Sequence, residues 1–204
     1  MIDLYTWTTP NGRKISIALE EMGLSYSVHA INIGSDEQFA PEFLKISPNN
    51  KIPAIVDKEN GLSVFESGAI LTYLAEKSGQ FLPPENPERA KVLEWLSWQM
   101  AGFGPMLGQL NYFLNRAETK MPDAIKRFTD ETVRLFGVLD KQLANHDYVA
   151  GDYSIADMAI YPWSSVAYAI VKASTGTTCR NVEKWHELVS ARPAVQAGMA
   201  IPEV

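Results

Sequence analysis

The sequence has few of the residues that form redox-active thiol pairs, metal sites or nucleic-acid-binding surfaces. Among 204 residues there is one cysteine, Cys179, which excludes an intrachain disulfide and any Cys-x-x-Cys pair. The three histidines, His29, His146 and His186, lie far apart and lack the spacing of metal ligands, so we expect no bound metal. Lysine and arginine number 18 against 24 acidic residues, a formal net charge of −6, which argues against nucleic acid as a partner.

Long apolar runs are also missing. The nearest to a membrane-spanning length, residues 161–171, is interrupted by Pro162 and two serines, so we expect no membrane partner. The single cysteine and the lack of a signal peptide together predict a cytoplasmic protein. An apolar fraction of 46% over this length predicts a core that needs no metal or disulfide to hold it together.

A proline-rich segment divides the chain. Residues 80–87 contain three prolines, which remove backbone donors and disfavour helix in the residues before them. The residues before this segment alternate between short apolar strands and helices, whereas the residues after it have the periodicity of long helices. The sequence therefore predicts a domain at 1–80, a linker at 81–87 and an all-helical domain at 88–204.

The first domain is predicted to be a small mixed sheet with helices packed on it. Thr9 and Pro10 signal a helix start, because threonine caps a helix and proline suits its first position, and Gly23 marks the helix end. The residue pair Asn60-Gly61 predicts a hairpin turn. The expected strands are 1–7, 27–33, 54–56 and 63–65, and the expected helices are 10–22, 41–46 and 67–77. This order, β-α-β-α-β-β-α, indicates an α/β fold.

The second domain is predicted to be a helical bundle. The expected helices are 89–116, 123–145, 154–172 and 182–191. In the second of them, Leu135, Leu139 and Leu143 recur at helical spacing and form one core-facing stripe. Ser154 and Asp157 have the spacing of a capping box at the start of the third. The predicted fold class is thus an α/β domain followed by an all-α domain.

Sequence order suggests that three loops of the first domain, 8–11, 49–53 and 66–68, meet at one edge of its sheet. Each loop also has an ordinary structural interpretation. Thr9 can simply cap a helix, and Glu66 can simply be an acidic residue near the positive end of a helix dipole. Because only about 5–6% of X–Pro bonds are cis, the base rate predicts a trans bond before Pro53. No single loop decides the function.

In combination, these motifs resemble the glutathione transferase superfamily, and within it the bacterial nu-class disulfide-bond oxidoreductases, which are related to the transferase domain of a yeast nitrogen-regulation prion protein. The motifs are Thr9-Pro10-Asn11-Gly12, 43–55 and 65–74 in the first domain, and 104–109, 153–157, 185–187 and Arg192-Pro193 in the second. The resemblance spans almost the whole chain. It implies a thioredoxin-like, glutathione-binding domain followed by a helical one, glutathione as the co-substrate, and a homodimer.

The resemblance also implies how the γ-glutamyl end of glutathione is bound. Ser67 offers its hydroxyl and backbone N–H to the ligand carboxylate, while Glu66 pairs with the ligand ammonium. A cis bond at Pro53, as the resemblance implies, exposes the backbone of Ile52 for strand-like pairing with the cysteinyl unit.

Three further residues are given binding roles by the resemblance. Lys51 and Gln38 lie where the family contacts the glycyl and backbone polar groups of glutathione. Arg127, in the helical domain, matches the position that reaches the carboxylate of a second glutathione. For Arg127, a solvated surface arginine on a helix is the alternative interpretation.

The reactive sulfur is expected to come from the ligand. Thr9 and Asn11 lie at the start of the first helix, where donors and a partial positive charge stabilise a thiolate, but neither is a cysteine or a tyrosine. The resemblance therefore implies a disulfide reductase that exchanges ligand thiols and disulfides, with weak peroxidase and transferase activity. The alternatives are a transferase that conjugates a hydrophobic electrophile, and a non-catalytic binding or regulatory protein. Ala101, Phe103 and Tyr112 depart from the family pattern and motivate the last alternative.

Overall fold

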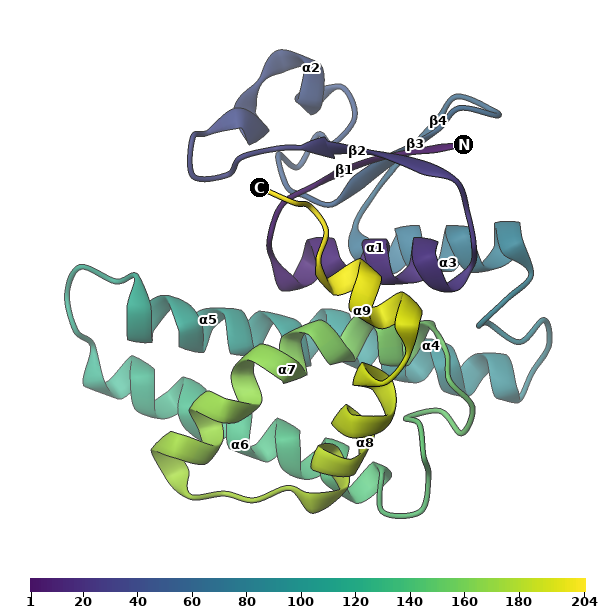
Figure 1. Ribbon diagram of the computed structural model, residues 1–204. Helices are drawn as coiled ribbons and strands as arrows, with labels where there is room; N and C mark the ends of the chain where they lie inside the picture. The colour runs from purple at the N-terminus through teal and green to yellow at the C-terminus, as the bar shows by residue number, and fades with distance from the viewer. The chain divides into compact units, whose positions relative to one another are not determined.

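The computed structural model describes residues 1–204, apart from the side chain of Ser174. The chain forms two compact units, which differ in architecture (Figure 1). The α/β unit comprises Met1–Pro84 and Ser190–Val204, and the helical unit comprises Glu85–Val189. Among the helices that the structure describes, none combines the length and the hydrophobicity needed to cross a bilayer.

The α/β unit is built on a four-stranded mixed sheet. Its strands are β1 (Ile2–Thr6), β2 (Tyr26–Ala30), β3 (Ala54–Asp57) and β4 (Leu62–Phe65), in the spatial order β2-β1-β3-β4. β1 runs parallel to β2 and antiparallel to β3, and β4 runs antiparallel to β3. The helices are α1 (Pro10–Glu21), the short turn η1 (Glu37–Phe39), α2 (Pro41–Leu44), α3 (Ser67–Ser78) and α9 (Pro193–Met199). The predicted order of strands and helices up to α3 is confirmed, and η1 is an addition to it.

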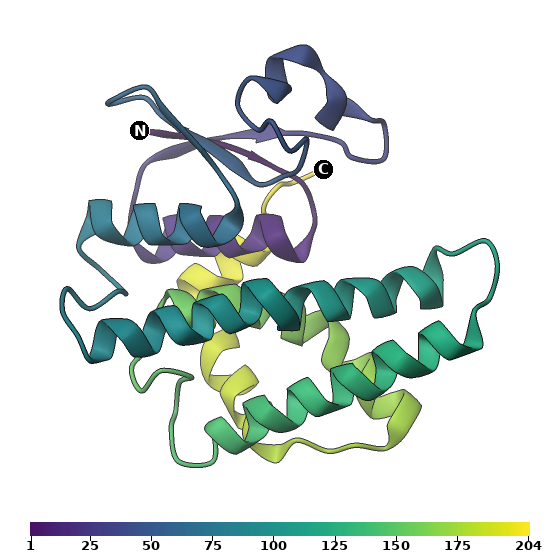
Figure 2. The ribbon, with the colours of Figure 1, turned by 180° about the vertical axis from the view of Figure 1, so that it is seen from behind.

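The sheet separates two layers. Helices α1 and α3 lie on one face, and α2 lies beyond the other (Figures 1 and 2). Successive side chains of a strand point to opposite faces, and the Tyr5 ring lies 6.2 Å from the ring of Phe43 in α2. Ile2 and Leu4 therefore face α1 and α3, where both are fully buried. This buried layer fixes the strand ends from which the candidate site is built.

The C-terminal helix α9 returns to the α/β unit, which differs from the predicted boundary that placed residues 190–204 in the helical domain. It packs closely on α1, because a Cβ at Gly198 would lie 2.5 Å from the Cα of Ile17. The Ser16 hydroxyl donates to the Gly198 carbonyl at 2.6 Å. Arg192 donates twice to the Glu21 carboxylate, at 2.6 and 2.7 Å. Glycine is required at position 198 because any side chain there would meet the α1 backbone.

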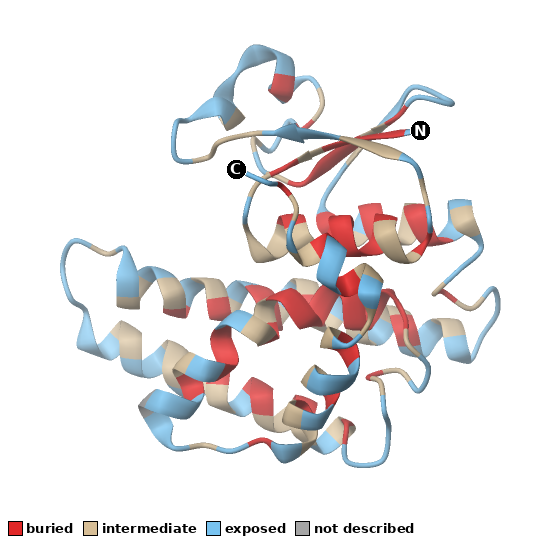
Figure 3. Ribbon diagram, in the orientation of Figure 1, coloured by how far each residue is buried: buried red, intermediate tan, exposed pale blue. Residues whose placement is uncertain are grey.

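The helical unit contains α4 (Glu88–Trp98), η2 (Gln99–Phe103), α5 (Gly104–Asn115), α6 (Pro122–Gln142), α7 (Ile155–Thr175) and α8 (Arg180–Ser190). The predicted single helix over 89–116 is instead interrupted by η2, a π-helical turn. Buried residues gather along α7 and the inner faces of its neighbours, as they do along α1 and α3 in the α/β unit (Figure 3). The all-α class predicted for this part of the chain is confirmed.

A buried carboxylate organises the start of α7. Asp157 accepts hydrogen bonds from the backbone N–H groups of Val149 and Ser154, at 3.0 and 3.1 Å, and from the indole of Trp185 at 2.9 Å. Burial raises the pKa of Asp157 to about 6, against the opposing effect of these donors. The capping box predicted from Ser154 and Asp157 is confirmed.

Candidate functional site

The three predicted loops do lie at one edge of the sheet. Thr6 at the end of β1 pairs with Ala30 at the end of β2, and Tyr5 pairs with Ala54 at the start of β3. Ala54 in turn pairs with Phe65 at the end of β4. The chain therefore leaves or enters all four strands along a single edge, which is where open α/β sheets bind ligands.

The first loop places Thr9 at the start of α1. Its hydroxyl oxygen accepts a hydrogen bond from the Gly12 N–H at 3.2 Å, so the hydroxyl proton can still be donated to another group. Gly12 approaches the end of β1 so closely that a Cβ would lie 2.5 Å from the Trp7 carbonyl oxygen. Asn11 lies in the first turn and is half-buried. The turn thus presents two polar side chains at the positive end of the helix dipole.

The third loop places Glu66 and Ser67 at the start of α3. Glu66 has φ +71° and ψ 115°, a conformation that a residue with a side chain seldom adopts. Its carboxylate accepts a hydrogen bond from the Asn49 side chain at 3.4 Å, which joins the second and third loops. Ser67 is the first residue of α3 and is buried. An exposed carboxylate and a hydroxyl at a helix N-terminus therefore adjoin each other.

A buried lysine lies behind Ser67, and sequence analysis missed it. The Lys14 ammonium donates to the Ser67 hydroxyl oxygen at 3.3 Å, and the Lys14 side chain is buried, with 2% of its surface exposed. Burial lowers the pKa of Lys14 to about 7, and the nearby Glu66 carboxylate opposes this shift. Lys14 lies four residues before Ala18 and next to Ile15, so helical periodicity puts it on the buried face of α1. This periodicity is the sequence signal that could have identified Lys14 as a buried residue.

The second loop contains Ile52, whose backbone is predicted to pair with the ligand. The Ile52–Pro53 bond is cis, so the trans expectation from base rates is wrong and the conformation implied by the family resemblance is present. Pro53 is buried, Ile52 is half-buried and Lys51 is exposed. The Ser47 hydroxyl donates to the Lys51 carbonyl at 2.9 Å and holds the loop.

Gln38 lies in η1, in the segment that leaves the same sheet edge after β2. Its amide nitrogen donates to Asp36 at 3.4 Å. Its amide oxygen is buried without a hydrogen-bond partner among the described residues. An acceptor is thus left for a donor that the described part of the protein does not supply.

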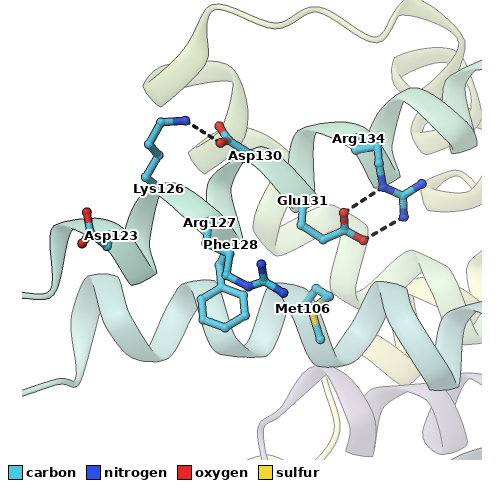
Figure 4. A pocket seen from close by; sticks show the side chains of 8 residues that line it. All are labelled: Met106, Asp123, Lys126, Arg127, Phe128, Asp130, Glu131 and Arg134. Carbon is cyan, nitrogen blue, oxygen red and sulfur yellow. Dashed lines mark hydrogen bonds and ion pairs between the residues drawn. The ribbon is translucent and has the colours of Figure 1, made fainter.

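Arg127 belongs to the helical unit, where it lines a cavity of about 670 Å³ along α6. Its neighbours are paired: Lys126 with Asp130 at 2.6 Å, and Arg134 with Glu131 at 2.7 Å. Figure 4 shows these two pairs and the Arg127 guanidinium beside them. Among the described residues, none forms a hydrogen bond or an ion pair with Arg127. The cavity therefore contains a cation available to an anionic ligand.

The three departures from the family pattern also lie in the helical unit. Phe103 is fully buried and its ring packs 4.9 Å from that of Trp98 and 5.3 Å from that of Phe136. It therefore fills the core. Ala101 is exposed, and Tyr112 is half exposed.

The described residues include no group of three His, Cys, Asp or Glu side chains that could hold a metal ion. Cys179 is buried in the helical unit, and burial raises the pKa of its thiol. A thiol in such surroundings is a poor nucleophile, because the thiolate is the reactive form.

The architecture is that of a thioredoxin-like α/β unit joined to an all-α unit. The family model of the glutathione S-transferase N-terminal domain matches residues 1–76, and that of the C-terminal domain matches residues 106–193. The chain therefore belongs to the glutathione S-transferase family.

Individual relatives have similar sequences and structures. The chain is 49% identical over 206 residues to the Escherichia coli K12 protein named disulfide-bond oxidoreductase YfcG, over 95% of this chain and 92% of that one. A glutathione transferase from Pseudomonas putida, crystallised with one glutathione disulfide per subunit, is 44% identical with a TM-score of 0.92, over 98% of this chain and 91% of that one. A family member from Pseudomonas fluorescens, with two glutathione molecules bound, is 43% identical with a TM-score of 0.92, over 98% and 93% of the two chains.

Proposed function

We propose that this protein is a glutathione-dependent disulfide reductase in which the ligands supply every reacting sulfur. The observation that carries the proposal is that the loops with Thr9, Asn11, Glu66 and Ser67 begin at one sheet edge, while the only cysteine is buried in the other unit. The names and bound ligands of the relatives support the same activity.

Glutathione binds by its γ-glutamyl end at the start of α3. The Ser67 hydroxyl and backbone N–H bind the ligand carboxylate, and Glu66 pairs with the ligand ammonium. The Ile52 backbone pairs with the cysteinyl unit in the manner of an added strand. Lys51 and Gln38 contact the remaining polar groups, and the buried oxygen of Gln38 accepts from a ligand N–H.

The chemistry is thiol–disulfide exchange. Thr9 and Asn11 donate to the glutathione sulfur and favour its thiolate. The thiolate attacks the glutathionyl sulfur of a mixed disulfide, the S–S bond breaks, and the departing thiolate takes up a proton. The overall reaction converts one glutathione and one mixed disulfide into glutathione disulfide and a free thiol. The two halves of the glutathione disulfide come from the attacking glutathione and from the glutathionyl group of the mixed disulfide.

In the helical unit, we propose that Arg127 binds a carboxylate of a second glutathione molecule. Arg127 interacts with the Glu131 carboxylate only through its charge and forms no hydrogen bond or ion pair among the described residues, whereas the other cations of the same cavity are held in ion pairs, and this difference supports the role. The reduced glutathione pool that such a reaction consumes is that of the cytoplasm, and we propose that the protein works there as a homodimer.

The test is glutathione-dependent reduction of the cysteine–glutathione mixed disulfide, with the oxidised product recycled by glutathione reductase. Loss of a hydrogen bond to a charged sulfur costs about 1.5–3 kcal/mol, so we expect Asn11→Ala to lower kcat/KM by roughly tenfold to a hundredfold. Cys179→Ala is the matched control and should keep the wild-type rate. A similar loss in both variants would contradict ligand-supplied sulfur.

The same proteins also test the alternatives. Turnover of an aryl halide that exceeds turnover of the disulfide would replace this proposal with a conjugating transferase. Retention on immobilised glutathione without turnover of either substrate would replace it with a binding protein.

A further inference from the structure

Asn49 makes a side-chain contact that joins two loops of the candidate site. Its amide nitrogen donates to the Glu66 carboxylate at 3.4 Å, although the two residues are 17 positions apart in the sequence. Asn49 lies in the second loop, three residues before Ile52, and Glu66 lies in the third loop, directly before α3. Neither the sequence motifs nor the family resemblance gave Asn49 a role in the site.

The turn that carries Asn49 is held by its neighbours. Ser47 is fully buried, and its N–H donates to the Phe43 carbonyl at 2.8 Å. The Ser47 hydroxyl donates to the Lys51 carbonyl at 2.9 Å, and the Asn50 N–H donates to the Ser47 carbonyl at 2.9 Å. Because the backbone on both sides of Asn49 is fixed and its side chain is short, its amide can occupy only a few positions.

Glu66 has a fixed backbone but a long, exposed side chain. Phe65 pairs with Ala54 in the sheet, and the Glu66 carbonyl accepts from the Ile70 N–H at 2.9 Å. A free glutamate side chain loses much rotamer entropy when a ligand fixes it in one conformation. The contact with Asn49 restricts these rotamers before a ligand arrives, so part of the entropy cost of binding is removed in advance.

The contact leaves the Glu66 carboxylate able to bind a cation. A carboxylate only accepts hydrogen bonds, so Asn49 must turn its amide nitrogen toward Glu66, and this bond uses one of about four lone-pair sites on the two oxygens. The charge of Lys14 also acts on the Glu66 carboxylate. A hydrogen bond, unlike that charge interaction, weakens steeply when it is misaligned, so the bond from Asn49 is the one that sets the orientation of the carboxylate.

We propose that Asn49 is a positioning residue that holds the Glu66 carboxylate where it binds the ammonium of the γ-glutamyl group, and so makes the site selective for ligands with that ammonium. This inference rests on the proposed function, in which Glu66 pairs with the ligand ammonium. The cost of immobilising one long side chain corresponds to roughly twofold to tenfold in Kd, which is the contribution expected of Asn49.

The test compares two ligands that differ only in the ammonium. S-methylglutathione has the complete γ-glutamyl group and no free thiol, and its glutaryl analogue has the same structure without the ammonium. Calorimetric titration measures the Kd of each ligand for the wild type, Asn49→Ala and Asn145→Ala. Asn145 is the matched control, because it is an exposed asparagine in a loop of the helical unit.

We expect the wild type and Asn145→Ala to bind S-methylglutathione roughly tenfold or more tightly than the analogue, as a charge-assisted contact would give. Asn49→Ala should lower this ratio by roughly twofold to tenfold, because only the ligand with the ammonium uses Glu66. Asn49→Gln keeps an amide donor and should restore part of the ratio. In a Glu66→Gln background, Asn49→Ala should leave the ratio unchanged. If Asn49→Ala does not fold, Asn49→Ser takes its place with the same expectation, because serine is too short to reach Glu66.

A role of Asn49 in supporting the loop alone predicts a different result. Equal loss of affinity for both ligands in Asn49→Ala would overturn the proposal, and so would an unchanged ratio. A fall in the ratio that persists in the Glu66→Gln background would also overturn it, because the effect would not act through Glu66. A wild-type ratio near one would overturn it while leaving glutathione binding intact. Failure of the wild type to bind S-methylglutathione would instead reject the proposed function itself.

Discussion

The indole nitrogen of Trp185 donates to the carboxylate of Asp157 at 2.9 Å, and this bond joins α8 to the start of α7. The same carboxylate accepts from the backbone of Val149 and Ser154. Asp157 is fully buried, so all three donors depend on it for a partner. These hydrogen bonds hold the segment before α7 against the start of α7 and against α8.

Replacing this carboxylate should destabilise the fold. Asp157→Ala leaves three buried N–H donors, and the Ser154 hydroxyl that donates at 3.3 Å, without their acceptor. Each unsatisfied group costs about 1–3 kcal/mol, so we expect a loss of roughly 3 kcal/mol or more in the free energy of unfolding. Urea unfolding followed by circular dichroism measures it. Asp147→Ala, in the exposed part of the preceding loop, is the control and should change the value by less than about 0.5 kcal/mol. Equal effects of the two substitutions would contradict the bonding described.

Gly198 gives a second test of packing, in the α/β unit. Gly198→Ala would drive a Cβ to within 2.5 Å of the Ile17 backbone, so α9 must shift, and we expect a loss of about 1–3 kcal/mol. Gly137→Ala is the matched control, because nothing lies within 4 Å of its added Cβ and it lies inside α6. Alanine there should stabilise the protein by up to about 1 kcal/mol. Thermal unfolding of both variants would show opposite shifts in Tm, and parallel shifts would contradict the close approach of α9.

Lys14 also predicts a pH dependence of stability. Burial lowers its pKa from 10.5 to about 7 in the folded chain, so between these pH values the unfolded chain binds more protons. The free energy of unfolding therefore gains a contribution that rises as the pH increases from 7 to 10. Lys14→Met removes this slope. It should be more stable than the wild type by a few kcal/mol at pH 7, at about 1.4 kcal/mol per pKa unit, and the difference should shrink toward pH 10. Urea unfolding at four pH values checks this, and a difference independent of pH would show that Lys14 is not desolvated in the folded state.

The sequence predicted the elements whose start and end signals are local. Thr9 and Pro10 define the start of α1, and Gly79 ends α3 with a positive φ. The loops of the candidate site were placed correctly because the order of the strands brings their ends to one edge. The turn η2 and the return of α9 to the α/β unit were missed. Local signals were present but were not used, since Gly104 and Pro105 directly follow η2 and Pro193 begins α9. The return of α9 to the α/β unit has no such signal, because it depends on the contact of Gly198 with Ile17.

In the candidate site, too, the sequence predicted individual residues but not the tertiary contacts that surround them. Residue types and family resemblance indicated Glu66 and Ser67, but they gave no view of what lies behind them. The bond from Lys14 to Ser67 joins residues 53 positions apart, and only the packing of α1 against α3 creates it. The cis bond before Pro53 likewise contradicts the base rate and became an expectation only through the resemblance.

Glu66 and Ser67 are expected to contribute separately to ligand binding. Ser67→Ala removes a donor to the ligand carboxylate, and Glu66→Gln removes the charge that pairs with the ligand ammonium. Each should weaken binding of S-methylglutathione by roughly tenfold or more. The glutaryl analogue of that ligand lacks the ammonium, so Glu66→Gln should barely change its affinity, whereas Ser67→Ala should still weaken it. Unchanged affinity for S-methylglutathione in both variants would reject the assignment of the site.

Arg127 leads to a prediction about stoichiometry. If its guanidinium binds the carboxylate of a second glutathione, Arg127→Met should weaken the second binding event by roughly tenfold or more and leave the first unchanged, because charge-assisted bonds to carboxylates are worth about 1.5–3 kcal/mol. Lys126→Met changes the neighbouring cation by the same charge, but Lys126 is already paired with Asp130 at 2.6 Å and is exposed to solvent. We therefore expect it to bind two ligands as the wild type does. Calorimetric titration with glutathione resolves the two events. A second event that survives in Arg127→Met, or that weakens equally in Lys126→Met, would leave Arg127 as an ordinary surface arginine.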